Sequence, residues 1–330
     1  MMADPKGFSV PVVFADRFYM SEKSLEKISS LGGYRMVEAV DARDLAEKMG
    51  GTPAVKVLIS EYIPVNDLVL DRAPGLKGVI SYGAGYDHID VLAMGRRGVQ
   101  VCNCRGENAQ AVAELAFGLL LSLMRRINRA DSWVRAGEWV KVGRALPEWV
   151  SGMELWGKTL GIIGLGQIGS RVIKIASGFG MKIICYDPFI NSSLYAKWSV
   201  DPATFDEVLS RADVLTLHLP LNPKTENLID ARAFAAMKPK MILVNTARGR
   251  VIEERALLDA LKTGRVKAAA LDVFSIEPLP AGHPLTRMEN VILSPHMGAM
   301  TVEAGERLSD SVARQVRDIL EGRPPECLIT

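Results

Sequence analysis

Three apolar segments in the last third of the chain are each followed by a side chain suited to acid–base or anion-binding chemistry. These side chains are Arg248, Glu277 and His296. A guanidinium beside a glycine, here Gly249, can hold a carboxylate through two parallel hydrogen bonds. Imidazole titrates near neutral pH and can transfer a proton, and a neighbouring carboxylate can orient its ring. Together the three predict a site that binds an organic acid and moves a proton.

Taken singly, each of these residues also has an ordinary structural interpretation. Arg248 could be a surface arginine, and His296 could be a histidine satisfied within the fold. The other histidines, His88, His218 and His283, are given no chemical role. The prediction therefore depends on what the rest of the chain provides for the same chemistry.

A glycine-rich segment provides a nucleotide-binding signal. The apolar run Thr159–Ile163 leads into the pattern GLGQIG and then into a helix-compatible segment. In a strand–loop–helix unit the three glycines allow a tight turn, close approach of the backbone to a pyrophosphate, and close helix packing. The pattern alone is weak, but its position between a strand and a helix favours a dinucleotide site. The predicted contacts of this loop are Gly164, Gly166, Gln167, Ile168 and Gly169.

Asp187 follows the next apolar run, Lys182–Tyr186, at the place where a carboxylate can accept hydrogen bonds from both ribose hydroxyls of an adenosine. Such a carboxylate would repel a 2′-phosphate, and neither Pro188 nor Phe189 supplies a positive charge to hold one. The sequence therefore predicts NAD as cofactor and makes NADP less favoured. A nicotinamide cofactor delivers a hydride. Where the hydride adds to a keto carbon it leaves an alkoxide, which His296 can protonate.

Alternating apolar runs and helical segments predict an α/β fold in two parts. The two strand series are separated by a helical segment from Asn108 to about Ile127, and apolar residues recur at helical spacing from Val302 to Ile319. The strands expected in the first series are Val10–Ala15, Lys56–Ser60, Gly78–Ser81 and Val99–Cys102. The six expected in the second are Thr159–Ile163, Lys182–Tyr186, Val214–Leu217, Ile242–Asn245, Ala268–Leu271 and Val291–Leu293.

Composition limits the function classes. A length of 330 residues suits two domains, and a net charge of +2 implies no nucleic-acid partner. No run approaches 18 apolar residues and the N-terminal segment is short for a secretory signal, so a cytoplasmic location away from membranes is expected. No metal is expected, because the cysteines lack metal-binding spacing. They are Cys102, Cys104, Cys185 and Cys327.

Assembled in order, these motifs resemble those of the D-isomer-specific 2-hydroxyacid dehydrogenases over nearly the whole chain. Several independent motifs in one order are far less expected by chance than any one of them. The shared segments are Gly83–Asp90, Gly164–Gly169, Asn245–Gly249, Leu271–Phe274, Glu277–Pro278 and Ser294–Gly298.

The resemblance implies an NAD-dependent enzyme that transfers hydride between the nicotinamide and C2 of a small 2-hydroxy or 2-keto acid. In that family pattern Arg248 binds the substrate carboxylate, His296 is the acid–base group and Glu277 is its partner. Backbone N–H groups of Ala84 and Gly85 are implied to hold the carboxylate from the other domain. Further cofactor contacts are implied for Leu219, Thr246, Ala247, Asp272 and Gly298, with Asp272 at the nicotinamide carboxamide.

The implied architecture has two doubly wound parallel-sheet domains with a cleft between them. Residues 102–297 would form a Rossmann NAD-binding domain, while residues 1–101 and 298–330 would form a flavodoxin-like substrate-binding domain. Family members are usually homodimers joined through the cofactor domain.

Within the family, residues 58–63 and 137–149 look like the glyoxylate and hydroxypyruvate reductase branch. A 3-phosphoglycerate dehydrogenase-type enzyme is the alternative, although the loop Ser60–Pro64 has no Arg or Lys for a phosphate.

Two further alternatives keep the same sheet. One is an NADH-sensing, corepressor-like binding protein, which would be distinguished by a partner-binding groove or a disordered tail. The other is a methyltransferase that uses the glycine loop for S-adenosylmethionine, in which Arg248, Glu277 and His296 would have no role. Fold alone does not separate these functions.

Overall fold

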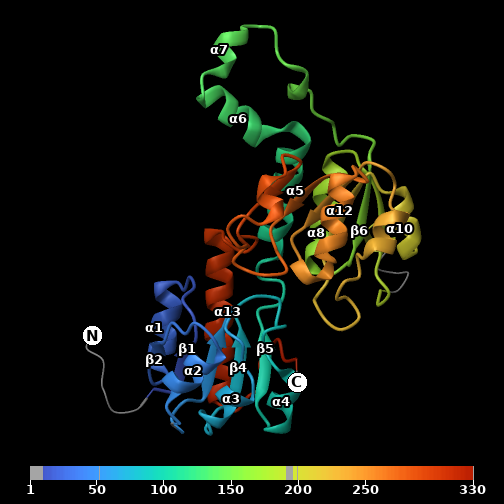
Figure 1. The fold of residues 1–330 in the computed structure, drawn as a ribbon. Helices are drawn as coiled ribbons and strands as arrows, with labels where there is room; N and C mark the ends of the chain where they lie inside the picture. Colours follow the sequence, from blue (N-terminus) through green and yellow to red (C-terminus); the bar gives the residue numbers. More distant parts are fainter. Residues whose placement is uncertain (1–9, 52, 191–195, 199, 330) are drawn as a thin grey trace. The chain divides into compact units, whose positions relative to one another are not determined.

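The computed structural model describes residues 10–51, 53–190, 196–198 and 200–329. It divides into two compact units, one of Met1–Asn108 with Ala299–Thr330 and one of Ala109–Gly298 (Figure 1). We refer to them as unit 1 and unit 2. Residues 1–9, which hold most of the N-terminal segment considered above as a signal sequence, lie outside the described residues.

Unit 1 contains a five-stranded parallel sheet with the order β2-β1-β3-β4-β5. In this flavodoxin-like order the chain reverses its direction of winding between β1 and β3. The strands are β1 (Val12–Phe14), β2 (Tyr34–Met36), β3 (Val57–Ser60), β4 (Gly78–Ser81) and β5 (Gln100–Asn103).

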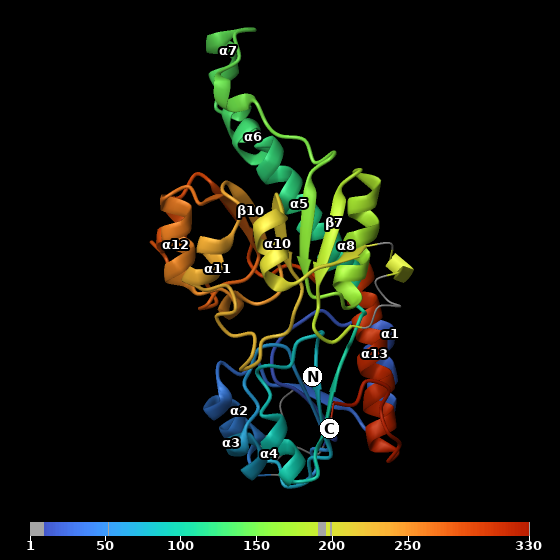
Figure 2. The same cartoon turned by 90° about the vertical axis from the view of Figure 1, so that its right-hand side faces the viewer.

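Helices cover both faces of this sheet. Val12 and Phe14 point to a core shared with α1 and α13, whereas Val13 points to a core shared with α2, α3 and α4. Figure 2 shows the two groups of helices on opposite sides of the strands. The helices are α1 (Glu22–Ser30), α2 (Ala42–Met49), α3 (Asp67–Asp71), α4 (Val91–Arg96) and α13 (Val302–Leu320).

Unit 2 contains a seven-stranded parallel sheet with the order β12-β11-β10-β9-β6-β7-β8. Winding starts at β6 and reverses between β6 and β9, as in a Rossmann sheet. The strands are β6 (Thr159–Ile163), β7 (Lys182–Tyr186), β8 (Asp201–Pro202), β9 (Val214–Leu217), β10 (Met241–Asn245), β11 (Val266–Leu271) and β12 (Val291–Leu293).

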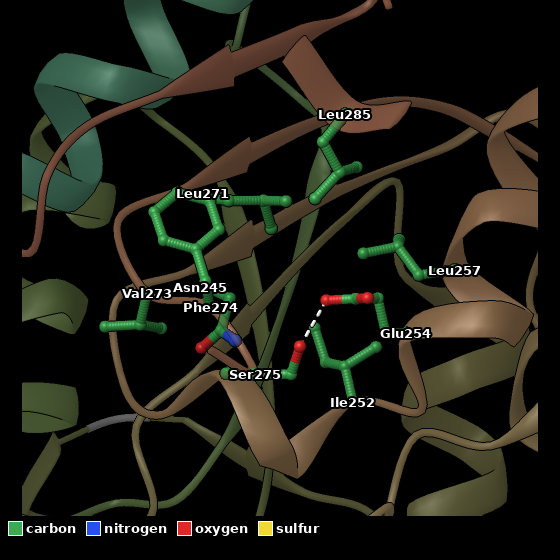
Figure 3. A pocket seen from close by; sticks show the side chains of 10 residues that line it. Asn245, Ile252, Glu254, Leu257, Leu271, Val273, Phe274, Ser275 and Leu285 are labelled. Atoms are coloured by element: carbon green, nitrogen blue, oxygen red, sulfur yellow. Dashed lines mark hydrogen bonds between the residues drawn. The ribbon is translucent and has the colours of Figure 1, made fainter. Parts of the chain in front are cut away.

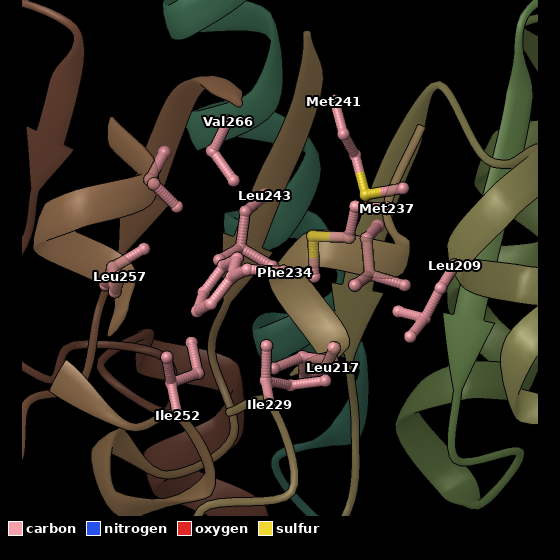
Figure 4. Packing of buried hydrophobic residues seen from close by; sticks show 14 of the residues in the cluster. Leu209, Leu217, Ile229, Phe234, Met237, Met241, Leu243, Ile252, Leu257 and Val266 are labelled. Atoms are coloured by element: carbon pink, nitrogen blue, oxygen red, sulfur yellow. The ribbon is translucent and has the colours of Figure 1, made fainter. Parts of the chain in front are cut away.

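Two apolar cores lie on the two faces of the unit 2 sheet. One is shared with α5 and α8, and the other is shared with α10, α11 and α12. Figure 4 shows the second core, in which Leu243 of β10 packs among Phe234, Leu257 and Val266. The helices are α5 (Ala109–Arg125), α6 (Ile127–Arg135), α7 (Glu138–Val142), α8 (Gln167–Gly178), α10 (Phe205–Arg211), α11 (Ala231–Ala236) and α12 (Glu254–Lys262), with 3₁₀ turns η1 (Glu148–Val150), η2 (Gly249–Val251) and η3 (Pro284–Arg287).

The prediction of two doubly wound parallel sheets is confirmed, with local corrections. The helix expected from Asn108 to Ile127 ends at Arg125, because Arg126 adopts a left-handed conformation with φ of 55° and α6 begins after it. Strands β2 and β8 were not predicted. Within the described residues, no helix is both long and apolar enough to cross a lipid bilayer.

The strand register places the predicted functional segments of unit 2 at one edge. Leu217, Asn245, Leu271 and Leu293 are aligned across β9, β10, β11 and β12, and each ends its strand. The loops that follow them therefore emerge side by side at the carboxyl edge, where open α/β sheets bind their ligands.

Candidate active site

The glycine loop joins β6 to α8, and a different feature of the local geometry accounts for each of its glycines. Gly164 has φ of 97°, and a Cβ there would lie 2.3 Å from the carbonyl oxygen of His218. A Cβ at Gly169 would lie 2.3 Å from the carbonyl oxygen of Gly164, so this glycine allows α8 to pack against the loop. A Cβ at Gly166 would meet nothing within 4 Å. The backbone at Gly166 therefore faces open space, as close approach to a pyrophosphate requires.

Asp187 lies beside the glycine loop at the end of β7. Its Oδ2 accepts a hydrogen bond from the N–H of Leu165 at 2.8 Å, and its Oδ1 accepts one from the N–H of Phe189 at 2.9 Å. Gly166 is the N-cap residue of α8 and makes no side-chain hydrogen bond to the first turn of the helix. No capping side chain therefore competes with a ligand for the N–H groups of Gln167 and Ile168. These features fit a dinucleotide with its pyrophosphate at the helix N-terminus and its ribose at Asp187.

Thr246 supplies a further indication that this edge binds a ligand. Its hydroxyl is buried and has no hydrogen-bond partner among the described residues, although buried polar atoms are normally paired. Thr246 and Ala247 follow β10, and Leu219 follows the neighbouring strand β9. All three thus lie at the strand ends predicted to line the cofactor.

Asn245 shapes the turn that carries Arg248. Its side-chain Nδ2 donates to the carbonyl of Arg248 at 2.9 Å, and its Oδ1 accepts from the N–H of Ala247 at 3.0 Å. Arg248 also donates from Nη1 to the carbonyl of Ala247 at 2.8 Å. Sequence reasoning assigned Asn245 no role. The signal was a polar side chain at the end of an otherwise apolar strand, where a buried amide needs local partners.

Glu277 and His296 form the pair that was predicted. The distance from His296 Nδ1 to Glu277 Oε2 is 2.6 Å, and the side chains are 29% and 30% exposed, so a ligand can reach them. Burial alone would raise the pKa of Glu277. The hydrogen bond and charge of His296, the N–H of Phe274 and the charge of Arg248 outweigh burial and hold this pKa below its ordinary value. Glu277 is therefore a carboxylate at neutral pH, and it accepts from the ring Nδ1.

Asp272 holds the loop on which His296 lies. Its carboxylate accepts hydrogen bonds from Ser294 Oγ at 2.6 Å and from the N–H groups of Met297 and Gly298, both at 2.9 Å. Its carbonyl accepts from the N–H of His296 at 2.8 Å. Burial raises the pKa of Asp272 despite these donors. His296 has φ of 51°, a conformation that costs a non-glycine residue free energy, and these bonds stabilise it.

This position of Asp272 adds a role that sequence reasoning did not give it. Its carboxylate is engaged by its own unit, and it fixes the backbone on both sides of the histidine. Its contact with a nicotinamide carboxamide stays a prediction.

Ala84 and Gly85 belong to unit 1, in the loop after β4. Their loop is anchored through its carbonyls. The carbonyl of Ala84 accepts from Asn103 Nδ2 at 2.7 Å, and that of Gly85 accepts from Ser81 Oγ at 2.5 Å. The carboxylate-binding role of Ala84 and Gly85 therefore stays a prediction. Arg248, Glu277 and His296 all lie in unit 2, where the charge of Arg248 acts on Glu277 and Glu277 contacts His296.

Comparison with known proteins gives a consistent result. The family model described as D-isomer specific 2-hydroxyacid dehydrogenase, NAD binding domain, matches residues 117–298. A glyoxylate reductase from Thermofilum pendens is 40% identical over 268 residues, which cover 79% of this chain and 77% of that protein. A crystal structure of a glyoxylate reductase from Paecilomyes thermophila superposes with a TM-score of 0.87 at 30% identity, covering 97% of this chain and 98% of the other.

A D-3-phosphoglycerate dehydrogenase from Methanocaldococcus jannaschii is also similar, at 38% identity over 94% of this chain. The match spans 58% of that longer protein. The two kinds of relative differ in whether the named substrate carries a phosphate. Similarity alone therefore does not decide between a phosphorylated and an unphosphorylated substrate.

Proposed function

The chain belongs to the D-isomer-specific 2-hydroxyacid dehydrogenase family, and we propose that it is an NADH-dependent reductase of small, unphosphorylated 2-keto acids such as glyoxylate and hydroxypyruvate. The observation that carries this proposal is the 2.6 Å contact between Glu277 and His296 at the strand edge that also carries Arg248. This arrangement can bind an acid and deliver a proton next to a dinucleotide loop.

In the proposed mechanism, the planar guanidinium of Arg248 binds the substrate carboxylate through two parallel hydrogen bonds and so orients C2. NADH, when bound, supplies the hydride. Glu277 accepts a hydrogen bond from Nδ1–H of His296 and fixes the ring, so Nε2 is the nitrogen that transfers a proton to the substrate. That nitrogen gives its proton to the alkoxide oxygen as the C2–H bond forms. Oxidation of the 2-hydroxy acid reverses these steps.

The cofactor is held, in this proposal, by the backbone of Gly164–Gly169 and by the carboxylate of Asp187 at the ribose. A 2′-phosphate at the same place would meet the negative charge of Asp187, and so NADH is preferred to NADPH. The strand-end residues Leu219, Thr246 and Ala247 line the remainder of the cofactor site.

The preference for an unphosphorylated acid is supported by the loop after β3 in unit 1. The N–H groups of Glu61, Tyr62 and Ile63 all donate to the carboxylate of Asp16, at 3.0, 2.6 and 3.2 Å. Three clustered N–H groups could otherwise bind a phosphate. Here a carboxylate of the chain already occupies them, and Glu61 adds a second negative charge, so this loop disfavours a phosphorylated substrate.

We also propose a cytoplasmic homodimer. Helices α6 and α7 have no buried residues and extend away from the sheet of unit 2 (Figure 1). They expose Val134, Trp139 and Val140 to solvent. Exposed apolar groups of this kind on one segment favour a protein interface, and a second copy of the chain is the proposed occupant.

The test is a substrate panel. Loss of NADH absorbance is measured with glyoxylate, hydroxypyruvate, pyruvate, phenylpyruvate and 3-phosphohydroxypyruvate, and each assay is repeated with NADPH. We expect turnover of the small unphosphorylated acids with NADH. A higher kcat/KM for the phosphorylated acid would favour the phosphoglycerate dehydrogenase alternative, and binding of NADH without turnover of any acid would favour a sensor.

A further inference from the structure

A second acidic residue, Glu254, lines a small pocket together with Ser275 (Figure 3). Glu254 is the first residue of α12. Its Oε2 accepts a hydrogen bond from the hydroxyl of Ser275, and its Oε1 lies 3.1 Å from Nε2 of His283. One carboxylate thus binds two points of the segment 273–283.

The direction of the second bond follows from the other ring nitrogen. His283 Nδ1 accepts from the backbone N–H of Leu285 at 3.3 Å, so the ring proton is on Nε2 and is donated to Glu254. The side chain of His283 is 14% exposed and that of Glu254 is 32% exposed. The surrounding side chains Ile252, Leu257 and Leu285 are apolar and buried, which reduces competition from water.

The segment that Glu254 binds is the one that carries Glu277. Ser275 lies between Phe274, whose N–H donates to Glu277 Oε1 at 2.8 Å, and Glu277 itself. Phe274 also packs on the Arg248 turn, because a Cβ at Gly249 would lie 1.9 Å from the carbonyl carbon of Phe274. The Glu254 bonds therefore fix the backbone that sets Glu277 against His296.

We propose that Glu254 is a positioning residue for the reaction, acting through Ser275 and His283 on the loop that holds Glu277. The proposal rests on the proposed function, in which Glu277 orients His296. It assigns roles to His283 and Ser275, neither of which touches the substrate. Loosening this loop moves Glu277 away from the ring, and small displacements of reacting groups carry large costs in rate.

The test variant is Glu254→Gln, which keeps the shape but offers a single acceptor oxygen to two donors. We expect kcat to fall about tenfold, while KM for the keto acid and Kd for NADH stay within about twofold, because Arg248 and the glycine loop are unchanged. Asp259→Asn is the matched control, an acid-to-amide change at an exposed position of the same helix, and it should leave kcat unchanged.

A double-mutant cycle separates positioning from general stability. If Glu254 acts through Glu277, adding Glu254→Gln to Glu277→Gln causes little further loss of kcat. If the fold-loss of kcat in the double variant equals the product of the two single-variant losses, the proposal is overturned. A fall in thermal stability and NADH affinity that accounts for the lost activity would overturn it as well.

A second measurement needs no substrate. In proton NMR of the full chain, the His296 Nδ1–H resonance is assigned by its absence in His296→Gln. We expect Glu254→Gln to shift or broaden this resonance and Asp259→Asn to leave it unchanged. An unchanged resonance in Glu254→Gln contradicts the positioning role, even if no 2-keto acid is turned over and the proposed function itself fails.

Discussion

The role proposed for Arg248 depends on the shape of its side chain. Its guanidinium is planar and presents paired N–H donors, whereas an ammonium presents one point charge. The turn that carries Arg248 is held by hydrogen bonds between its backbone and the side chain of Asn245. In the proposed mechanism, orientation of the substrate therefore comes from the geometry of Arg248 as well as from its charge.

Arg248→Lys should accordingly be severe although the charge is retained. We expect kcat/KM for the keto acid to fall about 100-fold, because the paired hydrogen bonds are lost. Steady-state kinetics check this, with Arg250→Lys as the control, since Arg250 pairs with Glu226 at the surface. Wild-type kcat/KM in Arg248→Lys would show that Arg248 does not bind the carboxylate.

Single residues were predictable from the sequence where each one closely follows a strand. Arg248 and His296 follow apolar runs, and the parallel sheet brings such ends to one edge. Asp16 and Glu254 were not predictable in this way. Asp16 binds N–H groups about 45 residues away, and Glu254 binds Ser275 across 21 residues, so their partners are determined by tertiary contacts.

At the level of elements, strands that form continuous apolar runs were the most predictable. The bounds of β6, β7, β9 and β12 agree with those of the predicted apolar runs. Strand β2 was missed because its three residues, Tyr34, Arg35 and Met36, do not form an apolar run. The break between α5 and α6 was missed because the left-handed conformation of Arg126 has no glycine to mark it.

The segment after β9 gives a prediction for stability. Burial lowers the pKa of His218 to about 3. Below an ordinary histidine pKa of about 6.5, the unfolded chain binds a proton here that the folded chain does not. The free energy of unfolding therefore falls as pH falls, by about 2 kcal/mol from this residue between pH 7 and pH 5.

Urea unfolding of the wild type and His218→Gln at pH 7 and pH 5 measures this contribution. The wild type should lose about 2 kcal/mol more stability than the variant over that interval. Equal losses would show that His218 is protonated in the folded protein.

At the level of the whole molecule, the family, the fold and the nicotinamide cofactor were all predicted from ordered motifs, and the comparisons confirm them. Substrate choice and oligomeric state remain proposals, because they depend on surfaces that motifs do not encode. The segment of α6 and α7 is one such surface, and next to it Trp149 of η1 packs edge-on against Trp133 of α6.

Val140→Asp tests the proposed dimer. Val140 is 87% exposed on α7, and a buried unpaired charge at an interface is costly. Light scattering after gel filtration should give a dimeric mass for the wild type and a monomeric mass for the variant. Val302→Asp, at another exposed valine at the start of α13, should remain dimeric. A monomeric wild type would rule out the homodimer.

The central claim is that His296, held by Glu277, donates the proton that completes reduction of a 2-keto acid. It is tested most directly by single-turnover oxidation of bound NADH by the best acid of the panel, in the wild type and in His296→Gln. NADH affinity should be unchanged, and the rate should fall about 10² to 10⁴-fold. A His296→Gln rate within a few-fold of the wild type would contradict the account.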